Sequence, residues 1–364
     1  MAVVNGRKPG SILFGAVVRP LQAFLRLEAA SAILLVACAA GALAWANLHP
    51  ASHRAVLEWR FVLGSGDRVV AFDLHQLVND GLMAIFFFLV GMEIKRELAV
   101  GELDTPARAA LPGIAALGGM IVPAGLFLAV SAGTPGAVGW GVPMATDIAF
   151  CIGVLRLAKR RVPASLLAFV TALAIFDDLG GILVIALFYG HGLSAAWLAF
   201  AGVVGLALLA MNRAHVSAAT AWIGAGAILW CALHEAGIHA TIAGVALGLA
   251  IPVRPRRPAR EVLGELARHV VELDGRPADE ELGGAEILLI EERLEELEPP
   301  LPRFVHALHP WVAFGIMPVF AVVNSGVAIR GLGPADLVEP VALGIAIGLL
   351  IGKPLGIFAF TAAA

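Results

Sequence analysis

Two adjacent aspartates lie inside an apolar run that is long enough to cross a lipid bilayer. Asp177 and Asp178 stand near the middle of residues 166–188, and about 20 apolar residues in a helix span the roughly 30 Å of bilayer hydrocarbon. A charged carboxylate at that depth costs about 3 kcal/mol or more. Because the two charges repel, a proton and a small hard cation can compete for their oxygens. The pair is a candidate transport site, and two hydrogen-bonded acids that only fasten helices are the alternative.

One basic residue, Lys353, lies well inside another apolar run, residues 338–361. A buried ammonium needs a carboxylate partner if it is to stay charged. Asp177 or Asp178 is the obvious candidate for this partner. The alternative is a lysine whose side chain snorkels to the cytoplasmic surface.

Glycines and a proline interrupt the apolar run 139–157 just before Thr146 and Asp147. Pro143 lacks an N–H group, and its ring clashes with the preceding helical turn. Broken helices inside a membrane are tolerated where they line a cavity, and transporters use their ends to handle ions. We therefore expect Thr146 and Asp147 to support a break, with Asp147 opposing the positive end of a half-helix. An ordinary interfacial helix start, capped by either residue, is the alternative.

Charged and titratable residues gather at the cytoplasmic ends of two other runs. Glu93 and Glu97 are four residues apart and share a helix face, and Arg96 lies three residues from Glu93. His306 and His309 are also three residues apart. Acids at a funnel mouth attract cations, and histidines titrate near neutral pH. Helix-end salt bridges and interfacial anchoring are the alternatives. The sequence offers no third ligand near the two histidines, so it does not indicate a metal site there.

The composition indicates that membrane-spanning helices position these residues. Of the 364 residues, 59% are hydrophobic and 15% are charged, against about 25% charged in soluble domains. This predicts an all-α polytopic membrane protein of about ten spans. The net charge of −3 does not indicate a nucleic-acid partner, and nothing indicates a cofactor. The expected spans are 28–48, 77–97, 109–131, 139–157, 164–189, 194–211, 217–233, 236–252, 307–329 and 338–361.

The basic residues predict the orientation. With a cytoplasmic N-terminus, 20 of the 25 lysines and arginines fall on the cytoplasmic side and 4 on the other, as the positive-inside rule requires. Two segments lie outside the spans. Residues 50–76 are expected to form an extramembrane hairpin or loop. The insert 253–305 contains two amphipathic pieces, 260–273 and 285–297, which we expect to be short cytoplasmic helices.

Five segments resemble, in order and in register, those of the NhaA family of sodium/proton antiporters. They are Phe88-Leu-Val-Gly-Met-Glu-Ile-Lys-Arg-Glu-Leu98, Ala145-Thr-Asp-Ile-Ala-Phe150, Ala174-Ile-Phe-Asp-Asp-Leu-Gly180, Val319-Phe-Ala-Val-Val-Asn-Ser-Gly-Val327 and Leu349-Leu-Ile-Gly-Lys-Pro-Leu-Gly356. The resemblance runs from about residue 28 to about residue 361. It implies an NhaA-type fold with a broken helix and inverted repeats, for which this family is a type example. It also suggests a homodimer through residues 50–76.

The resemblance implies roles at the matching positions. Asp178 would bind Na⁺ or Li⁺ directly, Asp177 would be the second essential carboxylate, and Lys353 would pair with Asp177. Thr146 and Asp147 would form the break. The residues implied for a pH-responsive cytoplasmic funnel are Glu93, Arg96, Glu97, His306 and His309.

Three features depart from the family pattern. Val305 stands where the family often has an acid, and the 253–305 insert replaces a short connection. The family has twelve spans, whereas ten are expected here. We therefore expect a C-terminally truncated chain that lacks the last two spans and, with them, the second broken helix.

Together these features predict a secondary active transporter of the bacterial inner membrane, not an enzyme. It would exchange cytoplasmic Na⁺ or Li⁺ for external H⁺ by alternating access, under the control of pH. A carboxylate protease would need acids on two helices, whereas this pair is adjacent on one, and no serine has an evident base. A truncated membrane protein of the same family that transports nothing is the other alternative.

Overall fold

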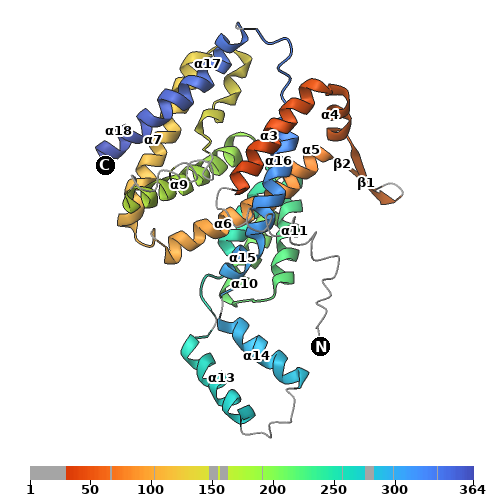
Figure 1. Ribbon diagram of the computed structural model, residues 1–364, viewed down its shortest axis with the longest axis vertical. Helices are drawn as coiled ribbons and strands as arrows, with labels where there is room; N and C mark the ends of the chain where they lie inside the picture. Colours follow the sequence, from red (N-terminus) through yellow and green to blue (C-terminus); the bar gives the residue numbers. More distant parts are fainter. Residues whose placement is uncertain are drawn as a thin grey trace, which may run out of the picture.

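The chain folds into a bundle of helices, with one β-hairpin and one helical insert projecting from it (Figure 1). The computed structural model describes residues 30–65, 68–101, 103–146, 155, 163–190, 192–255, 257–274, 283–297, 299–333 and 335–364. Within them, the strands form a single two-stranded sheet.

Within the described residues, seven helices are long and apolar enough to cross a membrane. They are α3 (Ala30–Leu48), the run of α5 (Leu74–Gln76), η2 (Leu77–Leu82) and α6 (Met83–Val100), α7 (Pro106–Ser131), α9 (Ala164–Phe188), α10 (Ala195–Arg213), the run of α15 (Pro300–Trp311), η5 (Val312–Ile316) and α16 (Met317–Asn324), and the run of α17 (Pro340–Ile347), η7 (Gly348–Gly352) and α18 (Lys353–Ala363). The helices α11 (Ala219–Glu235) and α12 (Thr241–Ala250) are shorter. Nine of the ten expected apolar runs therefore form helices, and the run 139–157 lies partly outside the described residues.

Two of these helices widen into a π-helical turn just before a proline. The turn η5 ends two residues before Pro318, and η7 ends two residues before Pro354. Proline donates no backbone hydrogen bond, and its ring crowds the carbonyl four residues back. A wider turn accommodates both effects without breaking the helix. In the second case, the widened turn directly precedes Lys353.

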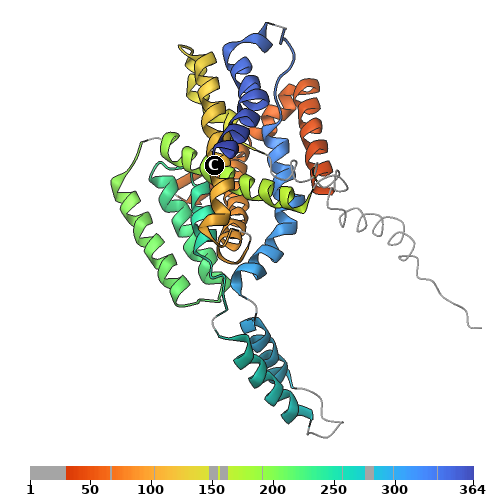
Figure 2. The same cartoon turned by 90° about the vertical axis from the view of Figure 1, so that its left-hand side faces the viewer.

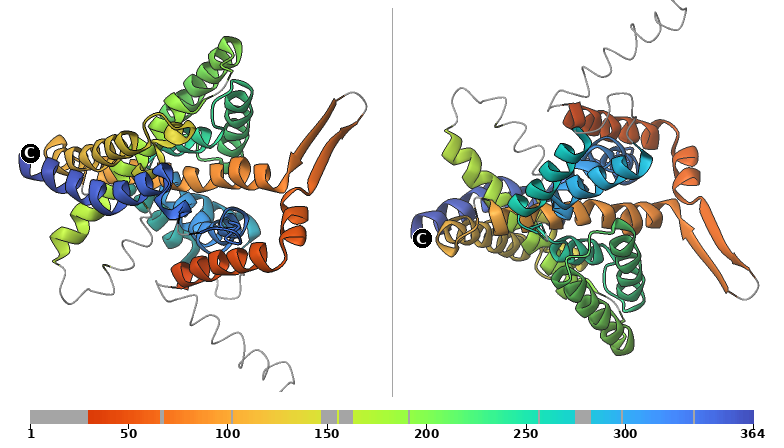
Figure 3. Two further views of the ribbon diagram at one scale, coloured as in Figure 1. Left: turned by 90° about the horizontal axis from the view of Figure 1, so that it is seen from above. Right: turned by 90° about the horizontal axis from the view of Figure 1, so that it is seen from below.

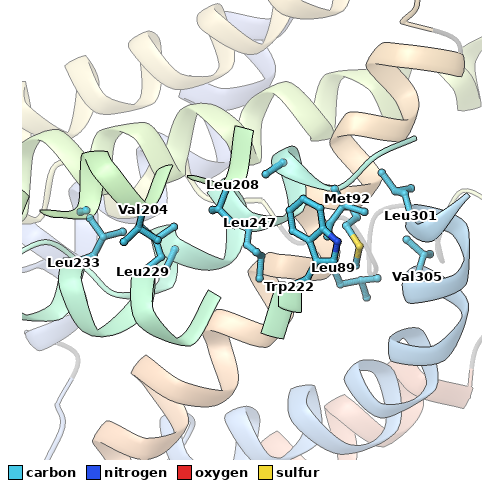
Figure 4. Close-up of a cluster of buried hydrophobic side chains, with 14 of the residues drawn as sticks. Leu89, Met92, Val204, Leu208, Trp222, Leu229, Leu233, Leu247, Leu301 and Val305 are labelled. Atoms are coloured by element: carbon cyan, nitrogen blue, oxygen red, sulfur yellow. The ribbon is translucent and has the colours of Figure 1, made fainter. Parts of the chain in front are cut away.

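The helices pack in two groups, which Figures 1 and 2 show from two sides. In one group, α7 packs against α9, α17 and α18; in the other, α6 packs against α12 and α15, and α10 against α11. The largest apolar core lies in the second group and is centred on the fully buried ring of Trp222 (Figure 4). The first group, by contrast, carries the polar residues of α9 and α18.

Close helix crossings depend on small residues. A side-chain Cβ at Gly118 of α7 would lie 2.3 Å from the carbonyl oxygen of Gly356, and one at Gly356 would lie 2.1 Å from that of Gly118. In the second group, a Cβ at Gly244 of α12 would lie 2.1 Å from the carbonyl oxygen of Ala84. Membrane helices approach closely where such residues let two backbones touch. These contacts place α18, and with it Lys353, against α7.

The two segments that the sequence predicts to lie outside the membrane have regular structure. Strands β1 (Arg60–Ser65) and β2 (Arg68–Asp73) follow α4 (Pro50–Leu57) and pair antiparallel, with Arg60 opposite Asp73. Figure 3 shows this hairpin reaching away from the helices. In the 253–305 insert, α13 (Ala259–Asp274) and α14 (Gly284–Leu297) pack against each other. They project beyond the rest of the bundle (Figure 1).

Candidate functional site

Asp177 is buried at the centre of the first helix group. It lies on α9, whose residues are otherwise almost all apolar, and it follows the buried stretch from Ala172 to Ile175. Only 3% of its surface is exposed. A carboxylate this deep must be paired or hydrogen-bonded to remain charged.

Lys353 provides the pairing charge. Its Nζ lies 2.7 Å from Oδ2 of Asp177 and also donates a hydrogen bond to the carbonyl oxygen of Met144. The lysine is 9% exposed, so its side chain does not snorkel to the surface. Of the two candidate partners that the sequence left open, the structure places Asp177 in the ion pair. Asp178, the next residue on α9, is half-buried.

An irregular segment supplies the remaining contacts. The short 3₁₀ turns η3 (Pro135–Gly139) and η4 (Val142–Met144) lead to Ala145 and Thr146, which are not helical. The Thr146 hydroxyl donates a hydrogen bond to Oδ2 of Asp177. The ring of Pro143 packs on η7, where a Cβ at Gly348 would lie 2.8 Å from it. The segment is therefore fitted against the helix that carries Lys353.

The two oxygens of Asp177 are in different situations. Oδ2 accepts hydrogen bonds from both Thr146 and Lys353. Within the part of the chain that the structure describes, Oδ1 is buried and accepts no hydrogen bond. A buried carboxylate oxygen without a donor is expensive. The arrangement can hold a positive charge on Asp177, either the lysine ammonium or a cation that replaces it.

The comparisons with known proteins identify the family. The family model described as "Na+/H+ antiporter 1" matches residues 22–364. The chain belongs to this family. A protein named Na(+)/H(+) antiporter NhaA from Anaeromyxobacter sp. (strain Fw109-5) is 61% identical over 357 residues, which are 98% of this chain and 78% of that protein. One from Myxococcus xanthus (strain DK1622) is 54% identical over 98% of this chain and 79% of its own length. The chain is therefore an NhaA-family membrane protein.

Five other residues that the sequence singled out lie on α6 and α15. Glu93 of α6 is half-buried and lies within electrostatic range of Arg96, Glu97 and His309. Arg96 and Glu97 are 3.5 Å apart. The structure thus brings four of the five residues implied for the NhaA funnel together, because α15 packs against α6.

The remaining predicted residues have different outcomes. His306 is exposed on α15, whereas Val305, which stands where NhaA proteins often have an acid, is buried in the apolar core. Asp147 lies outside the described residues. The role predicted for each site residue stays a prediction.

Sequence reasoning missed two contributors to the site. The carbonyl group of Met144 carries no side-chain signal, so no motif could reveal it. Tyr189 ends α9, and its hydroxyl bonds to the backbone of the irregular segment. It is the only tyrosine in the chain, which is the one sequence signal that could have drawn attention to it.

Proposed function

We propose that this chain exchanges cytoplasmic Na⁺ for external H⁺ across a bacterial inner membrane and acts as a secondary transporter, not as an enzyme. The observation that carries the proposal is the buried Asp177–Lys353 ion pair between α9 and α18. Membership of a family described as Na⁺/H⁺ antiporters supports the identity of the two ions.

The chemistry of the pair supports competition between ions. A cation that approaches Asp177 repels the Lys353 ammonium, and loss of a proton from that lysine removes the repulsion. The Thr146 hydroxyl can remain on Oδ2 in both states. Hard cations such as Na⁺ prefer oxygen ligands. Asp178, about 100° further round α9, would be the direct ligand of Na⁺ or Li⁺, and Asp147 would support the break beside it.

The mechanism that follows is alternating access. The carrier would reorient only when its carboxylates hold either protons or a cation, because an unpaired charge inside the membrane is costly. The group of Glu93, Arg96, Glu97 and His309 at the end of α6 would make exchange depend on pH, and His306 would extend it. The N-terminus would be cytoplasmic, and residues 50–76 would form the contact of a homodimer.

Exchange in everted membrane vesicles tests the proposal. Vesicles from a sodium-sensitive host are acidified by respiration, and Na⁺ is then added while the internal pH is followed. We expect Na⁺ to raise the internal pH when the chain is present. The Asp178→Asn variant should lose this response, whereas Asp104→Asn should keep it because Asp104 is exposed and, among the described residues, pairs with the exposed Arg108. Normal exchange by Asp178→Asn, or none by the unaltered chain, would refute the proposal.

A further inference from the structure

The hydroxyl of Tyr189 joins the end of α9 to the backbone of the irregular segment. Its Oη accepts a hydrogen bond of 3.0 Å from the N–H of Gly141 and donates one of 2.8 Å to the carbonyl oxygen of Val138. The ring packs beside Trp140, with the ring centroids 6.2 Å apart. One phenol thus satisfies both a donor and an acceptor on a stretch of chain that is not α-helical.

Such bonds matter because the segment is irregular. Its backbone N–H and C=O groups are not all paired within a regular helix, so they need partners from other elements. The turns η3 and η4 are too short to pair all their own groups. Gly141 permits the approach, since a Cβ at this position would lie 3.0 Å from Oη of Tyr189. A larger residue there would push the phenol away.

The segment that Tyr189 holds is also the one that completes the ion pair. A few residues beyond Gly141, the carbonyl of Met144 accepts from Lys353, and the hydroxyl of Thr146 donates to Asp177. Tyr189 is the C-cap residue of α9, the helix that carries Asp177. The helix and its C-cap residue therefore contact the segment at two points. Asp177 bonds to Thr146, and Tyr189 bonds to the backbone of Val138 and Gly141.

We propose that Tyr189 is a positioning residue for the transport site. Its hydroxyl fixes the segment 138–146 so that Met144 and Thr146 meet Lys353 and Asp177 in the geometry that accepts a cation. This inference rests on the proposed function. The simpler alternative is an aromatic residue that only anchors the end of α9 at the membrane interface. The two differ in what the hydroxyl does, because an anchoring ring tolerates its loss.

The Tyr189→Phe variant removes the two hydrogen bonds and keeps the ring. A looser segment populates the binding-competent geometry less often, which weakens apparent affinity by that fraction. We expect the apparent KM for Na⁺ to rise about tenfold, equivalent to about 1.4 kcal/mol, with kcat changed less than about twofold. The matched control is Thr171→Val, which removes one hydroxyl from α9; among the described residues, this hydroxyl bonds to the carbonyl oxygen of Leu167 in the same helix. An unchanged KM in Tyr189→Phe would overturn the proposal.

A double-mutant cycle separates positioning from general damage. Gly141→Ala should raise KM by placing a methyl group 3.0 Å from Oη. Tyr189→Phe removes this nearest atom, while the ring carbons Cε2 and Cζ remain at 3.3 and 3.5 Å. The double variant should therefore have a KM close to that of Tyr189→Phe alone. If the KM increases of the two single variants multiply in the double variant, the proposed role of the Tyr189 hydroxyl is overturned.

Because the chain has one tyrosine, 3-fluorotyrosine labels position 189 alone, and its ¹⁹F resonance reports on this residue directly. We expect the resonance to shift when Na⁺ binds and to stay in place in Asp178→Asn. A resonance insensitive to Na⁺, in a protein that exchanges normally, would refute the role of Tyr189 but not the transport function. Normal exchange by Asp178→Asn would instead refute the assignment of the site.

Discussion

The buried ion pair makes a prediction that does not depend on transport. Lys353→Met removes the ammonium and leaves the carboxylate of Asp177, which is 3% exposed, with the Thr146 hydroxyl as its remaining donor among the described contacts. Breaking a buried pair in this way costs about 3 kcal/mol or more. Asp177→Asn leaves the Lys353 ammonium buried without its charge partner, so it is also expected to cost about 3 kcal/mol, although the Met144 carbonyl remains as an acceptor.

The informative variant is the double one. Adding Asp177→Asn to Lys353→Met removes the unpaired charge, so the second substitution should recover about 2 kcal/mol of the stability lost by the first. Unfolding of the purified protein, followed in detergent by tryptophan fluorescence at mildly alkaline pH, measures these differences. The exposed pair Arg108–Asp104, 2.9 Å apart, is the control. The same double-mutant cycle at this pair should give a coupling free energy of less than about 0.5 kcal/mol. A double variant as unstable as Lys353→Met would refute the reasoning.

Two further predictions concern packing and the insert. Gly118→Ala places a methyl group 2.3 Å from the backbone of Gly356 and should destabilise the α7–α18 crossing by about 2 kcal/mol, whereas Gly125→Ala in the same helix meets nothing within 4 Å and should be neutral or slightly stabilising; equal melting temperatures would contradict this. In the insert, hydrogen bonds from Arg257 lower the pKa of Glu265, which also lies 3.5 Å from Arg293 of α14. Because the folded pKa is lowered, this contact stabilises the insert above the unfolded pKa of about 4.3 and is lost as pH falls through the folded pKa. The protection factors of α13 and α14 against hydrogen exchange, which correct for the slower intrinsic exchange at low pH, should therefore fall on acidification in the unaltered chain and fall less in Glu265→Gln, and the same fall in both would contradict the assignment.

The sequence predicted the helices of this protein better than the contacts between them. Long apolar runs can form only a few structures inside a membrane, so nine of the ten expected runs are helices. Periodicity could not decide whether Lys353 pairs with Asp177 or with Asp178, because adjacent residues point only about 100° apart. That choice depends on how α18 crosses α7, which Gly118 and Gly356 set. Contacts made through main-chain atoms, such as those of Met144 and Gly141, leave no trace in side-chain patterns.

The ion pair joins three parts of the chain that are distant in the sequence. Oδ2 of Asp177 on α9 holds Thr146 of the irregular segment and Lys353 at the start of α18. A buried ion pair adds little to stability compared with apolar residues of similar volume, so stability alone does not account for keeping a lysine and an aspartate here. On the proposed mechanism, a cation that displaces Lys353 breaks the ion pair that ties α18 to α9. Helix α18 in turn packs closely against α7 at Gly356. The same event releases the carbonyl of Met144, on the segment that Tyr189 holds. On this mechanism, cation binding at Asp177 would act on α7, α9 and α18 together, which is the coupling that alternating access requires.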